Sequence, residues 1–147
     1  MKRLHIHIKT NNLDQSVAFY TAMFGEAPSK LESDYAKWLL DDPRANVSLS
    51  THSGEPGIDH AGVSIESREE LDGVADRLRQ TGASLLAEEE TTCCYAKSNK
   101  FWVRDPQGAV WELFQTFGES ETYGAEPERE IFAAKAGADA APNACCP

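Results

Sequence analysis

The sequence predicts an α+β fold built from two tandem βαβββ modules. In each half, an alternating strand pattern precedes an amphipathic helix, and three short strand patterns follow the helix. The spacing also repeats, because His5 precedes the helix cap Asn12 by seven residues and His60 precedes the cap Ser67 by seven. An internal repeat of this kind generally sets the architecture of a chain.

The first module is expected to cover about residues 1–54. Residues 4–9 alternate apolar and polar side chains, which is the period of a half-buried strand. Asn12 can then cap a helix that Gly25 ends. The apolar stripe of this helix comprises Leu13, Val17, Tyr20 and Phe24. Three short strands are predicted over 27–31, 36–40 and 47–51, with a turn at 41–44.

The second module, about residues 57–117, repeats this order. An alternating strand is expected around residues 60–65, followed by a helix that Ser67 caps and Gly82 ends. The apolar stripe of this helix comprises Leu71, Val74, Ala75 and Leu78. Strands are predicted over 84–90, 101–104 and 110–115, with a turn at 105–108.

The two modules differ in the stretch between the helix and the last turn. From the helix-ending glycine to the turn proline takes 18 residues in the first half (25 to 43) and 24 in the second (82 to 106). The six additional residues fall around 91–99, so Cys93 and Cys94 are expected on an enlarged loop. Loops on a rigid scaffold commonly carry function.

Length and charge restrict the classes of partner. The chain has 147 residues, 14 basic against 24 acidic side chains, and a net charge of −10. Nucleic acid and anionic membranes both favour a basic surface, so neither is expected as a partner. No apolar run approaches the roughly 20 residues that span a bilayer, and no apolar signal segment opens the chain. We therefore expect a cytoplasmic protein.

The four cysteines form two adjacent pairs, Cys93-Cys94 and Cys145-Cys146. Adjacent cysteines cannot staple distant segments as a secreted disulfide framework does. The pairs point to soft-ion or redox chemistry, with packing as small hydrophobes as the alternative for Cys93 and Cys94. The stretch 124–147 is rich in Ala, Glu, Pro and Gly and is expected to be a mobile tail. Its Cys145 and Cys146 would then be a tethered thiol pair that captures a product or a soft metal.

A metal site is predicted from His5, His60 and Glu112. Strand alternation places both histidines on the face of the sheet that points away from the helices, and Glu112 points opposite to its two apolar neighbours. Two histidines and one carboxylate are the ligand set associated with Fe(II) that activates oxygen. His7 lies on the same face and is the main alternative ligand, although we expect it to line the cavity. The last strand of the first module holds no fourth ligand, and His52 comes one residue beyond it.

These residues resemble the vicinal oxygen chelate superfamily, which includes glyoxalase I, extradiol dioxygenases and the fosfomycin and bleomycin resistance proteins. The resemblance covers about residues 4–117. It rests on His5, Asn12-Leu13, Ser16 to Tyr20, Phe24-Gly25, Asp59-His60, Asp105 to Gly108 and Trp111 to Leu113. It implies a curved mixed sheet around a metal-containing cavity, with the helices outside and metal positions at His5, His60 and Glu112. Glyoxalase I carries a second glutamate ligand in its first module, and the lack of one here counts against a glyoxalase.

A narrower set of stretches is similar to the ArsI carbon–arsenic lyases and their cadmium-induced relatives. The stretches are Tyr35 to Trp38, Asp41 to Pro43, Thr91 to Ala96 and Ser120 to Gly124. The resemblance implies that Cys93 and Cys94 hold a trivalent organoarsenical such as methylarsenite, while Fe(II) bound by His5, His60 and Glu112 uses O₂ to split the carbon–arsenic bond and release arsenite. It also implies a C-terminal cysteine pair in many members.

Two other functions remain open from the sequence. A protein that sequesters cadmium or arsenite on its cysteine pairs without turnover would carry the same thiols, because cadmium also prefers sulfur. A glyoxalase-like metalloenzyme or thiol transferase is the third alternative. Lys97 and Lys100 near the first cysteine pair could lower the thiol pKa values or serve only solubility. With both modules in one chain, either a monomer or a homodimer is compatible with a complete site.

Overall fold

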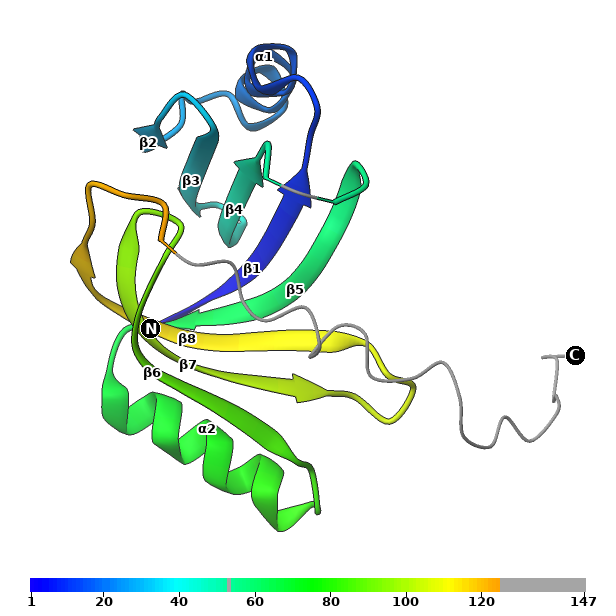
Figure 1. Cartoon of the computed structure of the whole chain (residues 1–147), viewed down its shortest axis with the longest axis vertical. Coiled ribbons are helices and arrows are strands. Elements are labelled where there is room, and N and C mark those ends of the chain that lie inside the picture. The colour runs from blue at the N-terminus through cyan, green and yellow to red at the C-terminus, as the bar shows by residue number, and fades with distance from the viewer. Residues whose placement is uncertain (53, 125–147) are drawn as a thin grey trace, which may run out of the picture.

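The computed structural model describes residues 1–52 and 54–124 and shows one eight-stranded mixed sheet with two helices. The strands in chain order are β1 (Lys2–Lys9), β2 (Lys30–Leu31), β3 (Tyr35–Asp41), β4 (Arg44–Ser50), β5 (Gly57–Ile65), β6 (Leu85–Cys93), β7 (Ala96–Arg104) and β8 (Val110–Glu119). Their order in the sheet is β2-β3-β4-β1-β5-β8-β7-β6. Each module therefore forms four neighbouring strands, and β1 and β5 join the two halves (Figure 1).

Helix α1 (Leu13–Phe24) begins and ends where the sequence predicts. The Asn12 side chain accepts a hydrogen bond from the Gln15 backbone N–H at 3.0 Å. Gly25 ends the helix with φ +74°, and its N–H donates to the Thr21 carbonyl. Glycine adopts this left-handed conformation without a steric penalty. The helix packs its apolar stripe on a core that includes Trp38 and Leu49.

Helix α2 (Arg68–Gln80) is capped in the same way at its start, whereas at its end Thr81 is the C-cap and Gly82 follows with φ +85°. The Ser67 hydroxyl accepts a hydrogen bond from the Glu70 N–H at 3.2 Å. Leu71 and Ala75 are completely buried against a second core that includes Ile65 and Phe101. None of the helices among the described residues is long and apolar enough to cross a membrane.

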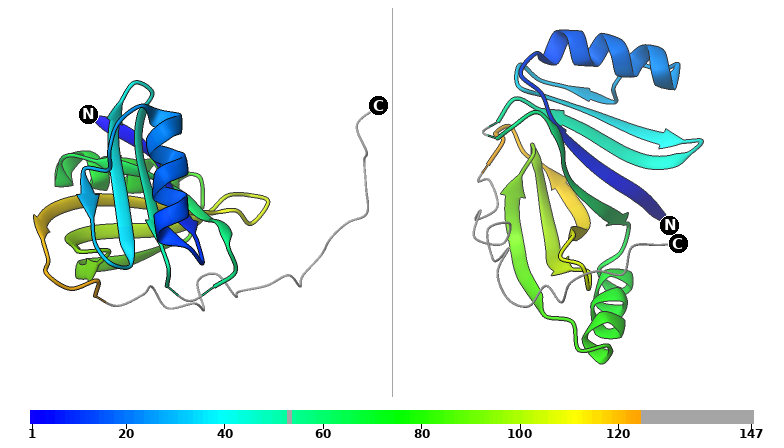
Figure 2. Two further views of the ribbon diagram at one scale, coloured as in Figure 1. Left: turned by 90° about the horizontal axis from the view of Figure 1, so that it is seen from above. Right: turned by 90° about the vertical axis from the view of Figure 1, so that its right-hand side faces the viewer.

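The two half-sheets meet along β1 and β5, which pair antiparallel with His7 opposite His60. Within each half, the first and last strands pair parallel, β1 with β4 and β5 with β8. The sheet curls about this junction, and both helices cover its outer, convex side (Figure 2). Within the described part of the chain no helix lies on the inner side, which leaves a concave face for a site. The predicted α+β class and the curved mixed sheet with external helices are confirmed.

Residues 91–99 do not form the enlarged loop that the sequence predicts. Strands β6 and β7 continue through this stretch as a hairpin, with Thr92 opposite Lys97 and Cys93 opposite Ala96. Cys94 and Tyr95 form the two-residue turn, with φ of +57° and +59°. Positive φ at both positions matches the twist of the flanking strands. The insertion thus lengthens the hairpin and places the cysteine pair at its tip.

The first module contains a strand that is shorter than predicted. Residues 27–31 were expected to be extended, but β2 comprises only Lys30 and Leu31. Pro28 within this stretch has no N–H to donate to a neighbouring strand, which limits pairing before residue 30. The predicted tail and its Cys145 and Cys146 lie outside the described residues, apart from Gly124 at its start.

Candidate metal and dithiol site

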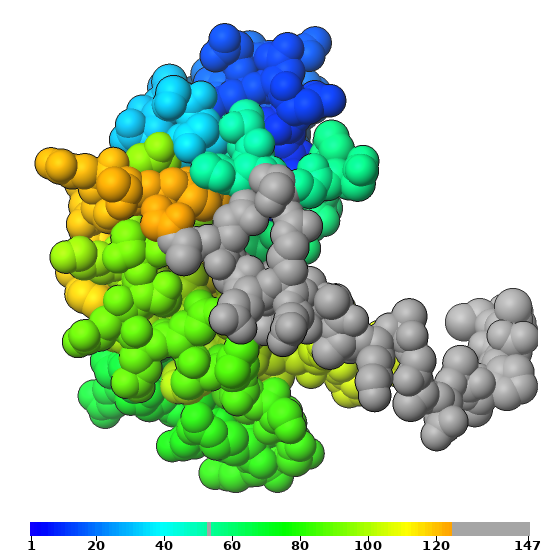
Figure 3. All heavy atoms as spheres, in the orientation of Figure 1, coloured from blue at the N-terminus to red at the C-terminus, as the bar shows by residue number. Residues whose placement is uncertain are grey.

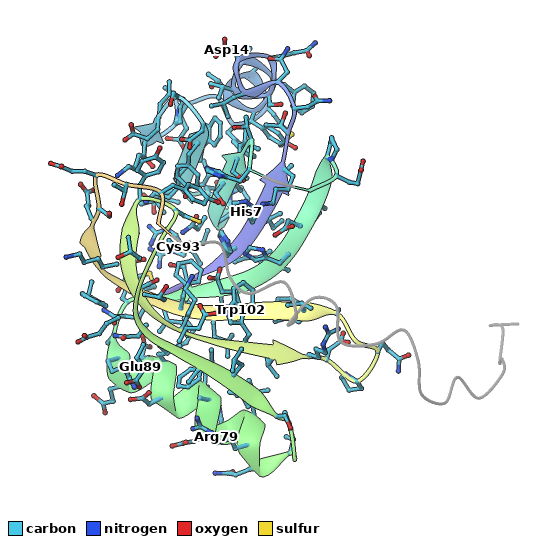
Figure 4. All side chains as sticks on the ribbon, viewed as in Figure 1. His7, Asp14, Arg79, Glu89, Cys93 and Trp102 are labelled. Carbon is cyan, nitrogen blue, oxygen red and sulfur yellow. The ribbon has the colours of Figure 1, made fainter. Side chains whose placement is uncertain are left out.

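A cavity of about 520 Å³ opens on the concave inner face of the sheet. Strands of both halves line it, and its walls include the predicted ligands together with both cysteines of the hairpin tip. In Figure 4, His7 on β1, Cys93 on β6 and Trp102 on β7 extend toward the hollow between the two halves. The parallel β1–β4 and β5–β8 pairs give this face side chains from matching positions of the two modules.

His5, His60 and Glu112 meet in this cavity. The Nε2 atoms of His5 and His60 lie 3.6 and 3.2 Å from the same carboxylate oxygen, Glu112 Oε2. All three side chains are buried, with residue exposures of 5%, 9% and 6%. The residues that the repeat spacing selected are therefore brought together by the fold, with one nitrogen or oxygen of each aimed at a common point.

The other nitrogen of each ring is held by a neighbouring oxygen. His5 Nδ1 lies 3.0 Å from the Asn46 carbonyl oxygen, and His60 Nδ1 lies 2.8 Å from Asp59 Oδ2. An Nδ1–H that donates to such an oxygen directs Nε2 into the cavity, where it can bind a metal ion once it has lost its own proton, as in metal-ligating histidines. Two imidazoles and one carboxylate suit a borderline metal such as Fe(II), and the donor set therefore fits that ion.

The charges of this cluster follow from burial and from Lys100. Burial lowers the pKa of His5 to about 4. Burial also acts to lower the pKa of His60, but hydrogen bonds with Asp59 and Glu112 outweigh it and raise that pKa to about 9. For Glu112, burial acts to raise the pKa, yet the Lys100 ammonium 2.7 Å away holds it well below the usual range. The carboxylate is therefore ionised and attracts a cation.

His7 lines the cavity beside the predicted ligands. One ring nitrogen each of His5, His7 and His60 forms a group whose members lie within 4.8 Å of one another. Both nitrogens of His7 are already engaged, because Nδ1 lies 2.8 Å from the Ser48 hydroxyl and Nε2 lies 2.8 Å from the Ser50 hydroxyl. Because both of its ring nitrogens are hydrogen-bonded, we interpret His7 as a residue that lines the cavity and not as a metal ligand.

The strand register identifies the residue of the first module that stands where a second carboxylate ligand would be expected. Gly62 pairs with Glu112 in the second module, and the equivalent pair in the first module is His7 with Ser48. Ser48 thus occupies the counterpart of the Glu112 position. His52 lies away from the cluster, where its Nε2 is 2.8 Å from Asp34 Oδ2 and its ring stacks on Tyr123.

The cysteine pair forms the second part of the cavity. Cys93 and Cys94 are free thiols, and their sulfur atoms lie 3.0 Å apart. Hydrogen bonding to Cys94 and burial raise the pKa of Cys93. The same hydrogen bond, now received by the thiolate, lowers the pKa of Cys94 despite burial, with further help from Lys100. When the pair has lost one of its two protons, the remaining proton therefore stays on Cys93 and the negative charge lies on Cys94.

Tyr123 and Lys100 complete the surroundings of the dithiol. The Cys94 sulfur lies 3.6 Å from the Tyr123 hydroxyl. Gly124, the next residue, forms an isolated antiparallel β-bridge with Cys93. In Figure 3 the orange segment that ends at residue 124 packs between the first module (cyan) and the green hairpin. Sequence reasoning placed Lys100 near the thiols but missed its ion pair with Glu112. It also missed Tyr123, whose role depends on how the segment after β8 folds back.

Comparisons with known proteins agree with this architecture. Residues 2–113 match the family model of the Glyoxalase/Bleomycin resistance protein/Dioxygenase superfamily. The chain is 41% identical over 119 residues to the trivalent organoarsenical cleaving enzyme of Bacillus sp. (strain MD1), covering 79% of this chain and 74% of that protein. It is 31% identical over 128 residues to the cadmium-induced protein CadI of Mycobacterium bovis, covering 86% of this chain and 84% of that protein.

A solved structure shares the fold at low identity. An extradiol ring-cleaving dioxygenase from B. fuscum superposes with a TM-score of 0.59 at 16% identity, covering 81% of this chain. The match covers 34% of that dioxygenase chain, so this protein spans about a third of its length. The family match and the relatives show that the chain belongs to the glyoxalase/bleomycin resistance/dioxygenase superfamily, in which it is related to the organoarsenical-cleaving and cadmium-induced proteins.

Proposed function

We propose that this protein is an Fe(II)- and O₂-dependent lyase that cleaves the carbon–arsenic bond of trivalent organoarsenicals, such as methylarsenite, to give arsenite. The observation that supports this most directly is one cavity with two different donor sets. His5, His60 and Glu112 gather on one side, and the Cys93–Cys94 dithiol lies at the hairpin tip. The name of the Bacillus relative, a trivalent organoarsenical cleaving enzyme, points to the same substrate class.

The two donor sets suit two different elements. Imidazole and carboxylate ligands would hold Fe(II) at His5, His60 and Glu112, whereas trivalent arsenic is thiophilic and suits the two sulfurs. Bound Fe(II) would supply the electrons needed to activate O₂ and would leave coordination positions for it. The protein's own contribution is to keep both reactants in one buried space, which converts an encounter in solution into a reaction between neighbours.

Capture of the substrate at the dithiol follows from the state of the two thiols. Methylarsenite carries two hydroxyl groups on arsenic. Two sulfur–arsenic bonds form and two arsenic–oxygen bonds break. One hydroxyl leaves as water with the proton of Cys93, and the other leaves as water with a proton from the solvent, because Cys94 reacts as the thiolate. Cys94, which carries the lower pKa, is the first nucleophile. Cys93 then closes the chelate, because its sulfur already lies 3.0 Å away.

Lys100 links the two halves of the site electrostatically. Its amine is buried with 4% exposure and donates to Glu112 Oε1, which leaves Oε2 directed toward the histidines. Its charge also favours the thiolate form of Cys94. One buried cation therefore orients the carboxylate and supports the nucleophile. Because all of these residues come from one chain, a monomer holds a complete site, and a homodimer would hold two.

The C-terminal pair Cys145 and Cys146 is proposed to receive arsenite or a soft metal after release from the cavity. Gly124, the last described residue, is bridged to Cys93 and therefore lies beside the dithiol. Tethering raises the effective concentration of a second thiol pair near the first.

The experiment that tests the proposal is anaerobic loading with Fe(II), followed by methylarsenite with and without O₂ and chromatographic separation of the arsenic species. Formation of more arsenite than protein, in a reaction that requires both iron and O₂, supports the lyase. Methylarsenite that stays bound and unchanged on iron-loaded protein contradicts it. That outcome would favour the second function, sequestration on the thiols, which the resemblance to a cadmium-induced relative also suggests.

A further inference from the structure

Two lysines face each other in the first module, and neither forms an ion pair with another described residue. Lys30 on β2 and Lys37 on β3 are directly opposite in the antiparallel register. Like charges in such a pair destabilise a sheet. Among the described residues, Lys2 and Lys100 form ion pairs with glutamates, whereas neither Lys30 nor Lys37 has a carboxylate oxygen within 4.0 Å. This arrangement is unexpected in a chain that carries ten more acidic than basic side chains.

Lys37 belongs to the wall of the cavity that holds the dithiol. Along β3, Tyr35 and Lys37 face the cavity, while Ala36 and Trp38 pack in the core beneath α1. Lys37 is half-buried, and burial together with the neighbouring Lys30 lowers its pKa. The protein thus keeps a partly desolvated amine on the inner face. Among the described residues this amine forms no ion pair, and the Glu119 carboxylate raises its pKa only from a longer distance.

Lys30 connects this amine to the cysteine hairpin. Its Nζ donates to the Tyr95 carbonyl at 3.4 Å and lies over the Tyr95 ring, 5.4 Å from the centroid. Tyr95 follows Cys94 in the turn, and Lys37 lines the same cavity as both sulfurs, so the lysine pair lies on the side of the cavity near the hairpin tip. Figure 1 shows β2 and β3 beside the turn between β6 and β7. A molecule held on both sulfurs therefore has a positively charged wall next to it.

We propose that Lys37, supported by Lys30, forms an anion subsite that recognises a carboxylate on the organic substituent of the arsenical held by Cys93 and Cys94. The proposal rests on the proposed function, because the dithiol supplies the anchor. A cavity of about 520 Å³ has room for a substituent larger than methyl. An ammonium that donates to a carboxylate in a partly desolvated site forms a stronger hydrogen bond than it forms with a neutral group.

The test compares two arsenicals of nearly the same shape, 4-carboxyphenylarsenite and 4-carbamoylphenylarsenite. Binding is measured on the reduced, metal-free full chain without oxygen, by protection of Cys93 and Cys94 from alkylation. Cys145 and Cys146 are replaced by serine throughout, so that the readout reports the cavity pair. We expect the carboxylate compound to bind about tenfold more tightly, since the ammonium attracts the charged carboxylate more strongly than the neutral amide oxygen.

Three lysine variants make the comparison specific. Lys37→Met should abolish the preference because it should lower the affinity for the carboxylate compound much more than the affinity for the carbamoyl compound, while Lys37→Arg, which keeps the charge, should retain the preference. Lys97→Met is the matched control, because Lys97 lies on the same hairpin but is exposed. Equal affinities in the parent protein, a preference that survives in Lys37→Met, or an equal loss in Lys97→Met would each overturn the subsite. If the parent binds methylarsenite but neither aromatic compound, the subsite is overturned and the proposed function stands. If the parent binds none of the three, dithiol capture fails, and the proposed function falls together with the subsite.

Discussion

His7 and His60 lie opposite each other on β1 and β5, and their rings stack with centroids 5.1 Å apart and planes within 5°. The two serines on β4 hold both nitrogens of His7, so its ring presents a fixed face to His60. His60 is thereby kept between His7 and its own partners, Asp59 and Glu112. The strand pair that joins the two modules thus also sets the orientation of one predicted metal ligand.

The proposed ligands predict a graded series of metal affinities. His5→Ala, His60→Ala and Glu112→Ala should each lower the affinity for Co(II) or Fe(II) by at least about 100-fold. His7→Ala should lower it only about tenfold, because residues that orient ligands typically contribute 10- to 100-fold. Titration with Co(II), followed by its absorption spectrum, measures these affinities. His52→Ala is the control and should bind normally, and a loss at His7 as large as at His60 would make His7 a direct ligand.

The dithiol predicts a separation between metal binding and substrate capture. Cys93→Ser and Cys94→Ser should each reduce arsenite formation from methylarsenite by about 100-fold or more, because a single sulfur cannot form the chelate. Iron content should remain that of the parent protein, since neither sulfur belongs to the His5–His60–Glu112 group. Arsenic speciation and metal analysis of the same samples provide the two readouts. Full activity in either serine variant would exclude capture by the pair.

The shared proton of the two thiols predicts an unusual alkylation profile. The pKa of Cys94 is lowered and that of Cys93 is raised. Alkylation by iodoacetamide should therefore begin at a lower pH than for an ordinary thiol, which is protonated until about pH 8.5. Mass spectrometry should find the first adduct on Cys94. In Cys93→Ala the hydrogen bond to the Cys94 thiolate is lost, so the onset should move to higher pH, and an unchanged onset would contradict this coupling.

The close approach of the Gly62 and Glu112 backbones predicts that a larger residue at position 62 disturbs the metal site. A Cβ at this position would collide with the backbone oxygen of Glu112, its parallel partner on β8. Gly62→Ala should therefore destabilise the protein by about 1–3 kcal/mol, as overpacking does, and weaken Co(II) binding by displacing the Glu112 strand. Thermal unfolding and metal titration check both effects. Gly73→Ala is the control, because its Cβ would meet only the end of Arg77 and alanine favours the helix.

The repeat and its caps could be predicted from the sequence because they depend on local patterns. Asn12 and Ser67 satisfy helix N-termini within three residues, and strand alternation places His5 and His60 on one face. Their approach to Glu112 then required only that the two modules share a sheet. The helix caps and the strand alternation depend on residues that are close in sequence, and the histidine spacing repeats along the chain. A residue pattern is therefore sufficient to predict these features.

The cysteine turn and its surroundings could not be predicted in the same way. Two-residue turns with positive φ favour asparagine and glycine, whereas here Cys94 and Tyr95 adopt that conformation. The contacts that accompany it come from distant segments, including Lys30 and Tyr123. Likewise, the ion pair between Lys100 and Glu112 depends on the register of β7 and β8, which a residue pattern alone does not fix.

The geometry of the hairpin tip has a thermodynamic consequence for how arsenic or cadmium would be held. A dithiol in a flexible peptide loses torsional freedom when an ion closes a ring through both sulfurs. In this protein, folding has already brought the two sulfurs to 3.0 Å and fixed the backbone between them. Chelation therefore begins from a preorganised clamp, and the favourable enthalpy of the metal–sulfur bonds is opposed by little further conformational entropy.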